Sequence, residues 1–220
     1  MPPTAAPTTP EKTVLDSRHF DANARRWDEN PVFQERGHQI AAAIAARVPL
    51  ATTMTVLDYG CGTGHSSFPL RERLGAIVMA DSSPGMLAVL AEKIAHLGVG
   101  NMRPRQLDLL ADPLPEERFD LIHTAMTLHH IPDTRRILAI FASLLKPGGH
   151  LCIADLDCED GSFHGPEYDV HPGFERPALA ARAAEAGFAD IDFQTVFEIV
   201  KERPEGTRAY PVFLMSARLA

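Results

Sequence analysis

The chain carries the stretch VLDYGCGTG at residues 56–64, where an apolar run ends in an aspartate and is followed by three alternate glycines. The run from Met54 to Gly60 predicts a buried strand, and a helical stretch follows through Leu74. Glycines at alternate positions let the backbone turn sharply and come close to a ligand, because no Cβ stands in the way. The stretch therefore predicts a strand, loop and helix with a ligand at the carboxyl end of the strand.

The same alternation of strand and helix continues along the chain. Strands are predicted at residues 76–81, 102–107, 119–125 and 150–156, and helices at residues 31–48, 84–97, 133–145 and 176–186. Alternating residues at 191–199 and a run from Tyr210 to Leu219 predict a final antiparallel pair. We therefore expect an α/β fold: a doubly wound, Rossmann-like, seven-stranded and mainly parallel sheet, with an antiparallel C-terminal strand and helices on both faces.

Composition narrows the class of protein. In 220 residues, 21 Lys and Arg stand against 29 Asp and Glu, and the net charge of −8 argues against a nucleic-acid binder held by phosphate contacts. No apolar run approaches the roughly 18 residues of a membrane helix, so no membrane partner is expected. Cys61, Cys152 and Cys158 form no CxxC pair, which predicts a reducing, cytoplasmic location. Oligomeric state stays open.

Two acids fall where a nucleoside ligand would need them. Asp81 ends the second predicted strand, 23 residues after Asp58, and its carboxylate could accept hydrogen bonds from both hydroxyls of a ribose. Asp108 follows the third strand and could receive the amino group of an adenine, although a helix cap or turn residue is the alternative. A nicotinamide dinucleotide fingerprint would need a glycine where His65 stands, so an NAD(P)-dependent oxidoreductase is disfavoured.

Residues 56–156 resemble the class I S-adenosylmethionine-dependent methyltransferases, in particular the branch that acts on small molecules. The motifs that carry the resemblance are VLDYGCGTG, MADSSPGML, the Leu-Asp pair at 107–108, FDLIHTAMTLHHIPD and LLKPGGHLCIAD. The resemblance implies S-adenosyl-L-methionine as cofactor and S-adenosyl-L-homocysteine as product. It implies cofactor contacts from Asp58, Gly60, Cys61, Gly62, Gly64, Asp81, Ser82, Met86, Asp108, Leu109, Thr124 and Ala125.

The N-terminal part is expected to be separate from this core. Residues 1–12 include four prolines and predict a disordered tail. The segment FDANARRWD at residues 20–28 is similar to the aromatic lid of such enzymes, in which Phe20 and Trp27 would cover the cofactor; an ordinary packing helix is the alternative. We therefore expect a helical lid over residues 13–50 and the methyltransferase domain over residues 51–220.

Histidines mark the expected point of methyl transfer. His129 and His130 follow the fourth strand, where either could act as a base that takes a proton from the acceptor; capping a helix or contacting the cofactor is the alternative. The adenine-methylating motif Asn/Asp-Pro-Pro-Tyr and the cytosine-methylating Pro-Cys pair are both absent after that strand. A small-molecule acceptor is therefore expected. The alternative function is a cofactor-binding sensor or scaffold without turnover.

The segment after the fifth strand holds the least explained residues. Loops at this end of such a sheet shape the acceptor pocket, so the candidate substrate contacts are Phe163, His164, His171 and Phe174. A metal site of mixed oxygen and nitrogen ligands, built from Asp155, Asp157, His164 and His171, is a weaker alternative. Its spacing matches no ligand motif, so we predict no metal. A solvated acidic loop with a structural histidine is the simpler interpretation.

Overall fold

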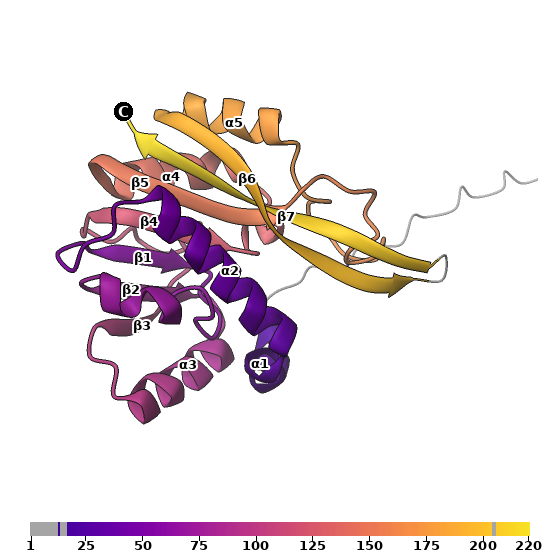
Figure 1. Cartoon of the computed structure of the whole chain (residues 1–220), viewed down its shortest axis with the longest axis horizontal. Helices are drawn as coiled ribbons and strands as arrows, with labels where there is room; N and C mark the ends of the chain where they lie inside the picture. The colour runs from indigo at the N-terminus through magenta and orange to yellow at the C-terminus, as the bar shows by residue number, and fades with distance from the viewer. Residues whose placement is uncertain (1–12, 14–16, 204–205) are drawn as a thin grey trace, which may run out of the picture.

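The computed structural model describes residues 13, 17–203 and 206–220, and its seven strands pair in the order β3-β2-β1-β4-β5-β7-β6 (Figure 1). The strands are β1 (Val56–Tyr59), β2 (Ile77–Asp81), β3 (Met102–Gln106), β4 (Phe119–Ala125), β5 (Leu145–Leu156), β6 (Phe188–Arg203) and β7 (Gly206–Leu219). The first five are parallel, and β7 runs antiparallel to both β5 and β6. The predicted fold class is confirmed.

Helices cover both faces because neighbouring residues of each central strand are both apolar. In β1, Val56 packs into one core and Leu57 into the other, and Leu121 and Ile122 of β4 do the same. The first core is covered by α2 (Pro31–Arg47), η1 (Phe68–Arg73) and α3 (Pro84–Leu97), and the second by α4 (Thr134–Leu144) and α5 (Arg176–Glu185). In Figure 1, α2 crosses in front of the sheet.

Local signals fix several helix ends. α3 begins at Pro84, after Ser83, whose hydroxyl accepts a hydrogen bond from the Met86 N–H, and it ends at Gly98 in a left-handed conformation. α4 follows Asp133, whose carboxylate accepts from the Arg136 N–H. Capping side chains satisfy N–H groups that the first turn of a helix leaves without partners.

Several predicted boundaries are wrong. β6 and β7 are longer than predicted, and two further differences change an element. The helix expected through Leu74 is only the short 3₁₀ helix η1, because Pro69 has no N–H with which to continue an α-helical ladder. β5 begins at Leu145 rather than residue 150, because Leu145 pairs with Phe119 across a register shift in β4. The strand therefore runs through the glycines that were expected to end the preceding helix.

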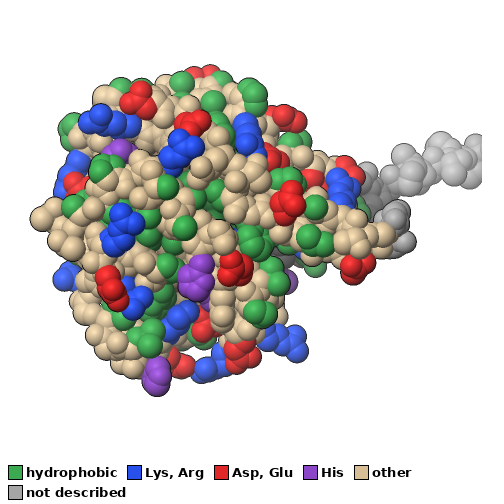
Figure 2. Space-filling model, viewed as in Figure 1, with side chains coloured by type: hydrophobic (Ala, Val, Ile, Leu, Met, Phe, Trp, Pro, Cys, Tyr) green, Lys and Arg blue, Asp and Glu red, His purple; other side chains and the backbone are tan. Residues whose placement is uncertain are grey.

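The N-terminal helix α1 (Ser17–Glu29) lies beside α3 (Figure 1), and the tail predicted at residues 1–12 falls outside the described residues. At the other end of the chain, the β6–β7 hairpin projects beyond the rest of the sheet. Acidic and basic side chains are interspersed over the face drawn in Figure 2. Within residues 13, 17–203 and 206–220, we find no helix both long and apolar enough to cross a membrane.

The carboxyl edge of the sheet is closed by a contact between Gly60, after β1, and Thr127, after β4. Gly60 has a φ of +68°, and a Cβ added there would collide with Cγ2 and Oγ1 of Thr127. The Thr127 hydroxyl also donates to the Gly60 carbonyl at 3.2 Å. A glycine is therefore needed at position 60 for both its conformation and its lack of a side chain.

We predict that Gly60→Ala lowers the free energy of unfolding by about 3 kcal/mol, through left-handed strain and overpacking against Thr127. Gly98→Ala is the matched control, because its φ is +63° and no atom lies within 4 Å of the added Cβ. It should cost only about 1–2 kcal/mol. Urea denaturation measures both values, and equal losses would show that contact with Thr127 contributes nothing.

Candidate active site

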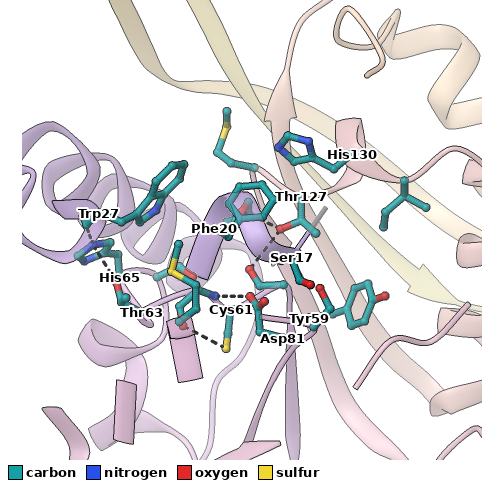
Figure 3. A pocket seen from close by; sticks show the side chains of 18 of the residues that line it. Ser17, Phe20, Trp27, Tyr59, Cys61, Thr63, His65, Asp81, Thr127 and His130 are labelled. Carbon is teal, nitrogen blue, oxygen red and sulfur yellow. Dashed lines mark hydrogen bonds between the residues drawn. The ribbon is translucent and has the colours of Figure 1, made fainter. Parts of the chain in front are cut away.

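A cavity of about 410 Å³ opens at the carboxyl ends of β1, β2 and β4, beneath α1 (Figure 3). The strand order reverses direction between β1 and β4, which is where sheets of this kind bind ligands. Eleven predicted site residues line it: Phe20, Trp27, Gly60, Cys61, Gly62, Asp81, Ser82, Met86, Asp108, Ala125 and His130. Five others lie behind its wall: Asp58, Gly64, Leu109, Thr124 and His129.

The glycine loop presents bare backbone to this cavity. Gly62 has a φ of +53°, and a Cβ built there would meet no atom within 4 Å, so a side chain would project into open space. Gly64, by contrast, is packed against Phe68 and Leu90. Gly62 is thus the position at which a ligand can approach the main chain most closely.

Asp81 holds this loop in place from the end of β2. Its Oδ2 accepts from the Gly62 N–H at 2.8 Å and its Oδ1 accepts from the Ser83 N–H at 2.9 Å. Burial raises the pKa of Asp81, and these two backbone donors partly offset that effect. A carboxylate has about four acceptor positions, so the group retains capacity for donors from the cavity.

Asp58 acts behind the loop rather than in its wall. It is 1% exposed, and its Oδ2 accepts from the Ser67 hydroxyl at 2.7 Å. Burial raises the pKa of Asp58, while nearby His123 and the Ser67 hydrogen bond lower it. Asp58 therefore supports the glycine loop from behind through Ser67, and its Oδ1 has no hydrogen-bond donor among the described residues.

Asp108 combines the two roles that the sequence allows. Its Oδ1 accepts from the Leu110 N–H at 2.9 Å, which makes it a turn residue, and it also lines the cavity. Leu109 behind it is 1% exposed and donates its N–H to the Tyr59 hydroxyl at 3.2 Å. The turn therefore fixes Asp108 in the cavity wall.

The aromatic residues of α1 reach into the cavity. In Figure 3, Phe20 lies between Asp81 and Cys61 on one side and His130 on the other, with Trp27 beside it. The Phe20 ring meets the Trp27 ring edge-on at 6.1 Å and the His130 ring at 5.3 Å. α1 is therefore part of the cavity wall.

Polar contacts fasten α1 to the start and middle of α3. Asp21 Oδ1 accepts from the Ser83 hydroxyl at 2.6 Å and from the Gly85 N–H at 2.8 Å. Lys93 of α3 donates to Asp28 at 2.6 Å. A carboxylate at a helix N-terminus also meets the positive end of the helix dipole. The same helix thus both covers the cavity and packs as an ordinary helix.

The two histidines after β4 differ in position. His130 lines the cavity, and burial, with smaller effects of His129 and His164, lowers its pKa to about 2. His129 is 2% exposed, and its Nδ1 lies 2.7 Å from Asp155 Oδ1 while its N–H donates to Asp155 Oδ2 at 3.2 Å. His130 faces the cavity, and His129 forms a buried pair with a carboxylate.

The four candidate substrate residues after β5 all lie outside the cavity wall. Phe163 is buried against Tyr210, Phe174 packs in the second core, and the His171 Nε2 donates to the Ile131 carbonyl at 2.9 Å. His164 instead meets the other two histidines, with ring centroids 5.1 Å from His129 and 5.3 Å from His130.

The mixed metal site considered from the sequence is not assembled. Asp155 binds His129, Asp157 forms an ion pair with Arg176 at 2.6 Å, and His171 contacts a backbone carbonyl. These residues have separate partners, so they do not share one ion.

Comparison with known proteins decides the family. A family model described as a methyltransferase domain matches residues 56–149. The ubiquinone/menaquinone biosynthesis C-methyltransferase UbiE of Marinomonas sp. (strain MWYL1) is 31% identical over 128 residues, covering 56% of this chain and 51% of that protein. Residues 56–149 therefore form a methyltransferase domain of the class I, S-adenosylmethionine-dependent type. It spans about half the length of the curated relatives it matches.

Solved structures share the methyltransferase fold. A SAM dependent methyltransferase from Aquifex aeolicus has a TM-score of 0.68 and 21% identity, covering 91% of this chain and 98% of that chain. The N-methyltransferase NodS from Bradyrhizobium japonicum WM9, solved with S-adenosyl-l-homocysteine, has a TM-score of 0.68 and 16% identity, covering 92% and 97%.

Thr127 and Arg36 are among the cavity residues that sequence reasoning missed. Thr127 follows β4 directly and was passed over beside the two histidines. Arg36 is only 7% exposed, and burial lowers its pKa to about 10. Arg36 stands four residues before Ile40 and eight before Ile44 on the apolar stripe of α2, so its charge on a buried face was the available signal.

We predict that Asp21→Asn loosens α1 of the methyltransferase, because the amide is a weaker acceptor than the carboxylate for the Ser83 and Gly85 donors. Backbone amides of residues 17–29 should exchange with deuterium about tenfold faster, as measured by mass spectrometry. Glu29→Gln is the matched control, since it neutralises an exposed carboxylate at the other end of the same helix. Equal exchange in all three proteins would contradict the role of Asp21.

Proposed function

We propose that this chain binds S-adenosyl-L-methionine in the cavity and transfers its methyl group to a small-molecule acceptor. The carrying observation is the pairing of Asp81 with Gly62: a carboxylate with spare acceptor capacity beside backbone that no side chain covers. When bound, S-adenosyl-L-methionine supplies a methyl group on a sulfonium; the acceptor's electron pair forms the new bond as the carbon–sulfur bond breaks, leaving S-adenosyl-L-homocysteine. The residues present fit this cofactor.

Each end of the cavity suits one part of that molecule. Asp81 would accept hydrogen bonds from the ribose hydroxyls, Met86 would pack on the adenine and Asp108 would receive its amino group. Gly60 and Gly62 would hold the methionine part by their backbone, with Asp58 bracing the loop from behind. Ala125 and Ser82 line the same cavity and would complete the contacts.

The lid over residues 13–50 is part of this proposal. Phe20 and Trp27 would close over the cofactor and exclude water from the point of methyl transfer. The closed cavity would also hold the acceptor in line with the methyl group. Support comes from the position of both rings in the cavity wall and from the attachment of α1 to α3. The domain boundary at residue 51 follows from this division of roles.

The acceptor would lie near His130, which lies in the cavity wall beside the Phe20 ring. His130 is neutral at neutral pH and holds a proton weakly, so its proposed part is to orient the acceptor by a hydrogen bond. His129, paired with Asp155, lies behind His130, with ring centroids 4.0 Å apart. The base role of either histidine stays a prediction.

A small-molecule acceptor is the proposed class for this site. The relative UbiE is named a C-methyltransferase and NodS an N-methyltransferase, so the family covers more than one acceptor atom. The cavity's volume of about 410 Å³ is in the range of small-ligand sites. A cytoplasmic location and the absence of nucleic-acid and membrane partners stay predictions.

We predict that Asp81→Ala weakens binding of S-adenosyl-L-methionine roughly 100-fold or more, because hydrogen bonds to a charged acceptor are lost. Asp81→Asn, which keeps an oxygen for the Gly62 N–H, should lose less and guards against a folding defect. Isothermal titration measures both, with Glu116→Ala as an exposed carboxylate control and NAD and NADP as control ligands. Unchanged affinity in Asp81→Ala would overturn the proposed binding mode.

We predict that His130→Ala keeps the affinity for S-adenosyl-L-methionine within about threefold and lowers the rate of transfer roughly 100-fold, as expected for a residue that positions or deprotonates the acceptor. The assay is release of S-adenosyl-L-homocysteine with a panel of phenols, thiols, amines and carboxylic acids. Cofactor binding without release for any acceptor would favour a sensor or scaffold. A full rate in His130→Ala would remove this residue from the transfer.

A further inference from the structure

Three histidines from two separate segments meet beside the cavity. His129 and His130 belong to η2 (Leu128–His130), and His164 comes from the segment between β5 and α5. One ring nitrogen of each lies within 4.8 Å of a ring nitrogen of the other two. Residues 35 positions apart in sequence are thus brought together by the fold, not by local geometry.

In the part of the chain that the structure describes, two ring nitrogens of this cluster lack the partners that buried polar atoms need. His130 Nδ1 and His164 Nε2 are buried without a hydrogen-bond partner among the described residues. Buried ring nitrogens ordinarily have a partner, because leaving them unpaired is unfavourable. Two unpaired nitrogens in one cluster indicate that something outside the chain completes it.

Asp155 gives His129 the arrangement that metal-binding histidines show. The Asp155 carboxylate hydrogen-bonds with the His129 Nδ1. It also accepts hydrogen bonds from the backbone N–H groups of His129 and Leu156, at 3.2 and 2.7 Å. A carboxylate on one ring nitrogen fixes the ring and makes the other nitrogen a better ligand. His129 Nε2 is therefore the atom left to face the cluster.

The β6–β7 hairpin holds His164 in position. The Phe163 carbonyl, just before His164, accepts from Lys201 Nζ and from an Arg203 guanidinium nitrogen, both at 2.9 Å. Lys201 also lies over the Phe163 ring, 3.5 Å from its centroid, and Ser162 and Tyr210 share a hydrogen bond of 2.8 Å. These contacts hold Phe163, the residue next to His164, against the β6–β7 hairpin.

We infer that His129, His130 and His164 bind one divalent transition-metal ion, with Asp155 orienting His129. Imidazole suits zinc, iron, nickel and copper, and three protein ligands leave a fourth position for another donor. Bonds of about 2.0–2.1 Å place ligand nitrogens about 3.4 Å apart, so the rings must close by on the order of 1 Å.

The open position would face the cavity, because His130 lies in its wall. The ligand class that suits it is a small molecule carrying an oxygen or sulfur donor. This extension to the acceptor rests on the proposed methyl transfer, whereas the metal site itself does not.

The test is titration of the full chain, first freed of metal by a chelator, with CoCl₂ and then competing ZnCl₂. We expect one equivalent of cobalt to bind and to give the visible absorption bands of a tetrahedral site. His164→Gln should weaken binding roughly 100-fold, and Asp155→Asn about 10- to 100-fold, as outer partners of ligating histidines do. His96→Gln, at an exposed histidine of α3, should bind like the natural chain.

Absence of the absorption bands, or equal cobalt affinity in the natural chain and His164→Gln, would overturn the metal site. Circular dichroism of each variant shows whether it is folded, and Asp155→Asn gives an independent result if His164→Gln is not. Titration of the same samples with S-adenosyl-L-methionine separates the two proposals: cofactor binding without cobalt binding would sink the metal site alone, and cobalt binding without cofactor binding would sink only the proposed transfer.

Discussion

The geometry of the site depends on two carboxylates that meet at the N-terminus of α3. Asp81 binds the N–H groups of Gly62 and Ser83, and Asp21 binds the Ser83 hydroxyl and the Gly85 N–H. The glycine loop, the start of α3 and the covering helix α1 are therefore joined through one short stretch of backbone. The N–H groups at the start of a helix need acceptors outside the helix. Here the carboxylates that accept from them also hold the cavity wall together.

Much of the fold could be predicted because its signals are local. The helix over residues 84–97 was predicted to the residue, since Ser83 and Pro84 mark its start and Gly98 its end. The central strands β1, β2 and β4 are largely apolar and buried, which a sheet covered on both faces requires. The start of β5 could not be predicted, because Leu145 joins the sheet through a register shift against Phe119 that depends on pairing, not on residue type.

The candidate site also contains residues that the sequence could place and residues that it could not. Residues next to strand ends, such as Asp81 and Asp108, could be placed because parallel strands deliver their following residues to one edge. His164 was expected to contact substrate, yet its neighbours are His129 and His130, and only the long hairpin that grips Phe163 brings them together. Its partners depend on tertiary contacts between distant segments, for which one sequence gives no periodicity or spacing. Arg36 differs, because its place on an apolar helical stripe was visible but was not used.

The long hairpin has a consequence for how such a site can diversify. Contacts at the cofactor end come from the loops after β1, β2 and β3, whereas His164 is set by Lys201, Arg203 and Tyr210 at the far end of β6 and β7. The two sets share no side chain in these contacts. Evolution can thus change the length or charge of the hairpin, and with it the surroundings of the histidines, without changing the residues around Asp81 and Gly62. The hairpin can therefore vary while the sheet and the glycine loop stay the same.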